Sequence, residues 1–175
     1  HKSHNWRRIT LNQIVVDIER GRLQGAEDRM NAIERALGHE KVEHIRARYL
    51  DSRSQRRIRF DARVRHEDIL AVALITGYRG LTSHLRGELD AARVHFERSI
   101  KVLQRMDEQR ALALIRRHKA SLHADLGELE SLRQESRLVI AGAESVRQLD
   151  IVYTGQLLEA ARLGLGSGPP EKKCG

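Results

Sequence analysis

Proline, cysteine and aromatic residues are scarce in this chain of 175 residues. The two prolines are Pro169 and Pro170, so no helix-breaking proline interrupts the 168 residues before them. Aromatic residues make up only 3% of the chain, whereas an all-β protein needs many turn residues and β-branched or aromatic strands. The single cysteine, Cys174, excludes an internal disulfide and a cysteine-based zinc site. These absences favour an all-α protein with an aliphatic core in a reducing, cytoplasmic setting.

Long apolar runs are also missing. The longest, residues 69–78, spans ten residues and is too short to cross a bilayer, so we expect no membrane partner. The chain begins with His1 rather than with methionine, and we expect it to be a piece of a longer protein.

Positive charge is present in excess and is concentrated in the first part of the chain. The formal net charge is +8. Residues 46–66 hold eight arginines against only Asp51 and Asp61. Such a cluster can meet nucleic acid or another acidic partner, or it can be a solvent-facing helix surface. Its only aromatic residues that could stack on bases are Tyr49 and Phe60, which gives little support to a base-stacking platform. The candidate basic patch consists of Arg46, Arg53, Arg56, Arg57 and Arg63.

Apolar residues recur every three or four positions, which indicates amphipathic helices. The stripe Leu89, Ala92, Phe96, Ile100 and Leu103 is an example. We expect helices over residues 5–20, 23–37, 40–51, 55–65, 67–86, 89–105, 108–126, 128–141 and 145–163.

Residue types at the ends of these segments support the expected boundaries. Asn5, Asp107 and Ser145 are suitable N-cap residues. Glycine after a periodic run is typical of a helix C-terminus. Such glycines are Gly21, Gly38, Gly87, Gly127, Gly142 and Gly164.

The spacing of the turns predicts a repeat. Gly21 and Gly87 are 66 residues apart, which is twice 33, and Gly127 follows Gly87 after 40 residues. A unit of 33–40 residues made of two antiparallel helices is the pattern of a helical-hairpin solenoid. Residues 40–66 read either as a degenerate hairpin or as an insertion with its own packing. A plain helical bundle is the alternative architecture.

Within this pattern, residues 73–103 resemble a tetratricopeptide repeat. The small residue late in the first helix is Gly80, the turn is Gly87-Glu88, and the small, large and small positions of the second helix are Ala92, Phe96 and Ser99. We expect Gly80 and Ala92 to face each other, so that the two helix backbones approach closely, and Phe96 to fill the gap to the next hairpin. The sequence departs from the family at two positions, where Thr76 replaces the usual tryptophan and Ser83 the usual tyrosine.

The resemblance implies a right-handed α-solenoid of antiparallel helical hairpins over residues 1–163, with a C-terminal capping helix at 145–163 and a flexible tail or linker at 164–175. Proteins of this family bind a peptide, a partner helix or an adjacent domain in a concave groove lined by the first helix of each hairpin. By the same resemblance, the groove would be formed by Arg8, Leu11 and Val15 of the first hairpin, by Leu74, Leu81 and His84 of the matched hairpin, and by Arg117, Ser121 and Asp125 of the next.

Signals for catalysis or metal binding are weak. His39 and His44 are five residues apart, one too many for the zinc-protease spacing, and do not share a helix face. Residues 77–80, Gly-Tyr-Arg-Gly, have the form of a loop that grips nucleic acid, yet they lie inside a helical pattern. We therefore expect no enzyme, no catalytic residues, no metal and no cofactor.

The sequence predicts a protein-interaction scaffold that binds a protein, a peptide or another domain of the same parent chain. The alternative is an all-α nucleic-acid-binding domain that uses residues 46–65.

Overall fold

A computed structural model of the chain describes residues 4–50, 64–145 and 158. Within these residues all regular structure is helical and no β-strand occurs. The predicted all-α class is therefore confirmed for the described part of the chain. The chain divides into two compact units, His1–Glu108 and Gln109–Gly175. None of the described helices is long and apolar enough to cross a membrane.

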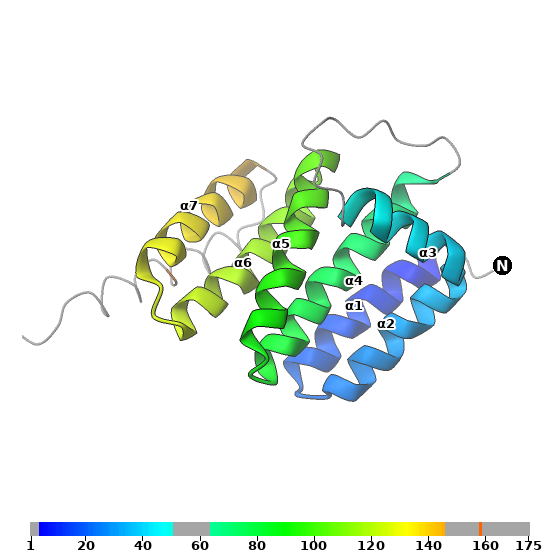
Figure 1. Ribbon diagram of the computed structural model, residues 1–175, viewed down its shortest axis with the longest axis horizontal. Helices are drawn as coiled ribbons and strands as arrows, with labels where there is room; N and C mark the ends of the chain where they lie inside the picture. The colour runs from blue at the N-terminus through cyan, green and yellow to red at the C-terminus, as the bar shows by residue number, and fades with distance from the viewer. Residues whose placement is uncertain (1–3, 51–63, 146–157, 159–175) are drawn as a thin grey trace, which may run out of the picture. The chain divides into compact units, whose positions relative to one another are not determined.

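The first unit contains two antiparallel hairpins, with a short helical segment between them in sequence (Figure 1). Helix α4 packs directly against both helices of the first hairpin. The helical segment between the hairpins in sequence is therefore not inserted between them in space, as a full repeat would be. The elements are α1 (His4–Glu19), α2 (Leu23–Leu37), α3 (His39–Ile45), the π-helix η1 (Arg46–Leu50), α4 (His66–Leu85) and α5 (Leu89–Met106).

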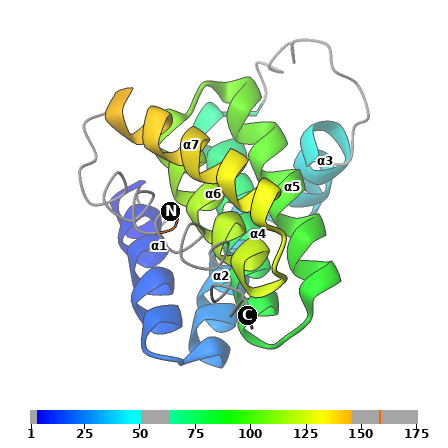
Figure 2. The ribbon, with the colours of Figure 1, turned by 90° about the vertical axis from the view of Figure 1, so that its left-hand side faces the viewer.

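The first hairpin is closed by a glycine turn, as expected. Gly21 has a positive φ of 71°, a conformation that glycine adopts without strain, and its N–H donates to the carbonyl of Ile18. Figure 2 shows α1 and α2 side by side, with this turn joining them at the bottom of the view. The apolar stripes of the two helices form the core of the pair, and Ile14, Met30 and Ile33 are fully buried.

The second hairpin depends on close approach at Gly80. A Cβ placed on Gly80 would lie 2.8 Å from Cδ1 of Phe96 and 3.2 Å from the carbonyl oxygen of Ala92. The predicted contact between Gly80 and Ala92 is thus confirmed. The fully buried ring of Phe96 lies over Gly80, within its own hairpin. Ser99 also joins the two helices, because its hydroxyl donates to the carbonyl of Ala73 at 2.7 Å.

The segment between the hairpins differs from the prediction. The helix expected over 40–51 is an α-helix only to Ile45 and continues as a π-helix to Leu50. Of the helix expected over 55–65, residues 55–63 lie outside the described residues. Residues 64 and 65 are not helical, and α4 begins at His66.

Four predicted helix ends are wrong. Ser145 is not the N-cap of a new helix, because it belongs to α7 (Leu129–Ser145). Asn5 is not an N-cap, because α1 already begins at His4. Asp107 is the C-cap of α5 rather than the N-cap of the next helix, and its φ of 57° is one that short polar side chains tolerate. Gly142 lies inside a helix that continues to Ser145, since no backbone reversal is needed there.

The described residues of the second unit form one antiparallel pair, α6 (Gln109–Asp125) and α7 (Leu129–Ser145). Gly127 connects them with a φ of 68°. Ala113 and Val139 pack together in its core. The capping helix predicted over 145–163 lies outside the described residues except at its first residue and at Leu158, and the tail at 164–175 lies wholly outside them.

Candidate functional site

A groove runs between α1 and α4, the first helices of the two hairpins in the first unit. Its cavity measures about 310 Å³. Three of the predicted groove residues, Arg8, Leu11 and Leu74, line it together. The apolar part of the lining is formed by Leu11, Leu70, Ala71, Leu74 and Tyr78.

Helical spacing explains why these side chains meet. Leu70, Leu74 and Tyr78 are four residues apart, so they lie on one face of α4. Leu11 and Arg7 are likewise one turn apart on α1. Leu11, Leu70 and Leu74 are only half-buried within the unit. The groove therefore presents an accessible apolar floor.

The other predicted groove residues do not line this cavity. Val15, Leu81 and His84 are half-buried on α1 and α4, at positions beyond its end. Arg117, Ser121 and Asp125 belong to α6 of the second unit, so the groove as defined by the first unit does not include them.

The prediction missed Arg7, Leu70 and Tyr78. Leu70 and Tyr78 could have been found by extending the four-residue spacing one turn to each side of Leu74. Arg7 lies one turn before Leu11, but the sequence gave no signal of its burial, because arginine usually lies at the surface and Arg7 is only 8% exposed.

A second, polar cavity of about 640 Å³ adjoins the groove, and we call it the basic hollow. Arg7 lines both cavities, so the two share a wall. None of the eight residues that line the basic hollow is acidic. Its polar and aromatic lining consists of Trp6, Arg7, Arg35, Lys41 and Arg65, which come from α1, α2, α3 and the residue before α4.

One buried carboxylate organises these cations. Asp68 is fully buried in the first turn of α4 and forms an ion pair with Arg7. Lys41 Nζ and Arg65 Nε each lie 3.4 Å from its Oδ2 atom. Burial alone would raise the pKa of Asp68, but the hydrogen bond from Arg7 and the charges of Lys41 and Arg65 hold that pKa below its ordinary value. One negative charge thus fixes three positive ones at the end of the groove.

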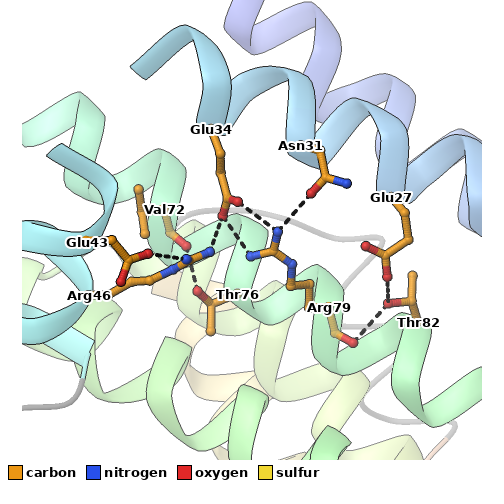
Figure 3. Close-up of polar contacts among 9 residues, drawn as sticks. All are labelled: Glu27, Asn31, Glu34, Glu43, Arg46, Val72, Thr76, Arg79 and Thr82. Atoms are coloured by element: carbon orange, nitrogen blue, oxygen red, sulfur yellow. Dashed lines mark hydrogen bonds and ion pairs between the residues drawn. The ribbon is translucent and has the colours of Figure 1, made fainter. Parts of the chain in front are cut away.

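The predicted basic patch is represented in the described residues by Arg46 alone. Its guanidinium donates to Glu34 and to Glu43, each at 2.6 Å (Figure 3). The charge of Arg46 is therefore compensated within the protein. The other members of the patch, Arg53, Arg56, Arg57 and Arg63, lie outside the described residues.

The residues that suggested a nucleic-acid loop take another role. Residues 77–80 lie within α4, as their helical pattern predicted. His123 Nδ1 lies 2.6 Å from Glu128 Oε2, where it joins the two ends of the α6–α7 turn. Within the described part of the chain, no group of three or more metal-ligating side chains is placed to hold an ion.

Comparisons of the chain with models of known protein families, with curated proteins and with solved structures found no match.

Proposed function

We propose that this protein is an interaction module that holds an extended segment of another protein, or of another domain of its parent chain, in the groove between α1 and α4. In this proposal the hairpins form a right-handed solenoid of the tetratricopeptide type. The observation that carries it is the half-buried apolar floor of the groove, which lies beside a hollow rich in positive charge. A groove of this kind suits a partner that inserts apolar side chains.

The chemistry of the two cavities defines the partner segment. Covering Leu11, Leu70 and Leu74 favours aliphatic side chains, each of which contributes about 1.5–3 kcal/mol when it is fully buried. The basic hollow, reached past Arg7, favours a carboxylate. The segment is therefore an aliphatic stretch followed or preceded by aspartate or glutamate. Glu67 on the groove lining disfavours a second acidic side chain over the apolar floor.

A displayed library of random peptides, selected against the full chain, tests this proposal. Enriched peptides are expected to combine aliphatic and acidic residues at a constant spacing. Selection against the Leu74→Lys variant should lose these peptides, because a lysine on the floor of the groove needs its charge solvated. Enrichment of the same sequences by both proteins would contradict the proposal.

A charge variant distinguishes the two cavities. Arg35→Glu places a carboxylate in the basic hollow, on an exposed part of α2. It should remove the preference for aspartate and glutamate and keep the preference for aliphatic residues. The matched control is Arg110→Glu, since Arg110 is exposed on α6 and lines neither cavity.

A further inference from the structure

A third cavity lies between η1, α4 and α5, and it is distinct from the groove and from the basic hollow. It measures about 200 Å³. Its α4 residues, Thr76 and Arg79, are two and five positions from Leu74, which turns them by roughly 140–200° around the helix and away from the groove. Four of its six lining residues are basic and none is acidic. They are Arg46, Leu50, Thr76, Arg79, His95 and Arg98.

Two of its guanidinium groups are held in place by one carboxylate. Arg79 donates to Glu34 from Nη1 and Nη2, at 2.7 and 2.8 Å, and Arg46 donates to the same Glu34 at 2.6 Å (Figure 3). Glu34 is not part of the cavity lining. The two positive groups are therefore fixed beside the cavity by a residue outside it, which is the arrangement of a preorganised site.

His95 adds an unsatisfied polar atom. Its Nδ1 is buried and has no hydrogen-bond partner among the residues that the structure describes. Burial and the charges of Arg79, Arg98 and Arg46 lower the pKa of this imidazole, and only Glu27 opposes them. A buried ring nitrogen normally finds a partner, so its absence here points to a ligand that supplies one.

The backbone at the cavity supports the same reading. Arg46 is the first residue of the π-helix η1, and π-helical turns occur frequently at functional sites. The positive groups come from three separate elements, η1, α4 and α5, and so surround the cavity from different sides. Arginine pairs well with the oxygens of a phosphate group, which accept hydrogen bonds in several directions.

We propose that this cavity binds a phosphate group, with Arg79 and Arg98 binding its oxygens and His95 Nδ1–H donating to one of them. The site has room for the phosphate and not for a peptide. It is independent of the groove, so the test of either proposal can fail while the other holds. The phosphate can be the free ion or the end of a small phosphate monoester.

Titration of the full chain with inorganic phosphate and, separately, with glycerol phosphate tests the proposal. Calorimetry gives the affinity, and the imidazole resonances of His95 report where the anion binds. Both ligands are expected to shift these resonances if the site takes a monoester, and only the inorganic ion if it takes the free anion. If neither ligand shifts them, the proposal is wrong.

Charge-removing variants give the matched comparison. Arg98→Gln changes an exposed side chain at the cavity, and Arg110→Gln changes an exposed side chain on α6. Arg98→Gln should weaken phosphate binding by about tenfold or more, the loss of one charge-assisted hydrogen bond, whereas Arg110→Gln should change it by less than about twofold. Equal losses would show that phosphate is attracted only by the net charge of the protein.

The role of His95 has its own readout. Sulfate keeps its charge between about pH 5 and pH 8, so any change in its affinity over this range comes from the protein. In the wild type the affinity should rise as the pH falls through the pKa of His95, because protonation adds a positive charge to the ring that donates to the anion. In His95→Gln this pH dependence should disappear. An unchanged dependence in the variant would remove His95 from the site.

Discussion

Replacing Gly80 by alanine tests whether close approach of α4 and α5 holds the second hairpin together. The added Cβ would lie 2.8 and 3.0 Å from two ring carbons of Phe96, whereas carbon atoms in contact prefer about 3.5–4.0 Å. The buried ring cannot move away without displacing its neighbours. Overpacking of this kind costs about 1–3 kcal/mol. Alanine is also the better helix former, by about 0.5–1 kcal/mol, which offsets part of the cost.

A double-mutant cycle separates these two effects. Gly80→Ala should lower the free energy of unfolding in urea, followed by circular dichroism, by about 0.5–2 kcal/mol. In a Phe96→Leu background the ring is gone, so the same change should be neutral or stabilising. Gly142→Ala is the control for helix propensity, because its Cβ would lie 3.7 Å from Ala113, an ordinary contact. Equal effects of Gly80→Ala in both backgrounds would refute the steric argument.

Three further predictions concern stability. Phe96→Ala should lower the free energy of unfolding by about 3–5 kcal/mol, because the ring is fully buried; a loss below about 1 kcal/mol, measured in the same urea assay, would mean that the ring is not part of the core. Asp68→Asn should cost about 3–5 kcal/mol, because it leaves the buried guanidinium of Arg7 without its charge partner, whereas the exposed control Asp28→Asn should cost almost nothing. Acid should destabilise the fold: the pKa values of Asp68 and Asp17 are lowered, so their stabilisation is complete above about pH 4 and is lost as the pH falls through the folded-state values. Urea titrations between about pH 6 and pH 2.5 should show this loss of the free energy of unfolding. The free energy should fall less steeply with pH in Asp68→Asn, and the same steepness in both proteins would contradict the role given to Asp68.

Much of the helical layout was predictable because local signals determine it. The boundaries 23–37 of α2 match the prediction, since a glycine with positive φ closes each side of that helix. The contact at Gly80 was predictable as well, because only a residue without a side chain fits opposite Ala92 and Phe96.

The failures arise where tertiary contacts override local preference. The helix predicted to end before Gly142 continues, because a glycine that packs against Ala113 needs no turn. The π-helix at Arg46–Leu50 has no signature in the sequence; it packs against α3, α4 and α5. Asp107 combines the features of an N-cap and of a left-handed C-cap residue, and composition alone does not distinguish the two.

The candidate site was predictable only in part for the same reason. Leu11 and Leu74 follow from helical spacing, and the structure places them in one groove. The basic hollow depends on residues far apart in the sequence, such as Arg7, Lys41 and Asp68, which meet only after α4 has packed against the first hairpin. Charge clusters along the sequence pointed instead to Arg46, whose charge is compensated by Glu34 and Glu43.

The affinity of a selected peptide for groove variants tests the central claim most directly. Fluorescence anisotropy would compare the wild type with Leu74→Lys in the groove and Val94→Lys on α5, where Val94 is an exposed apolar residue outside the groove. We expect Leu74→Lys to weaken binding by about tenfold or more, and Val94→Lys to change it by less than about twofold. Equal affinities for all three proteins, or an equal loss in both variants, would contradict binding in the groove between α1 and α4.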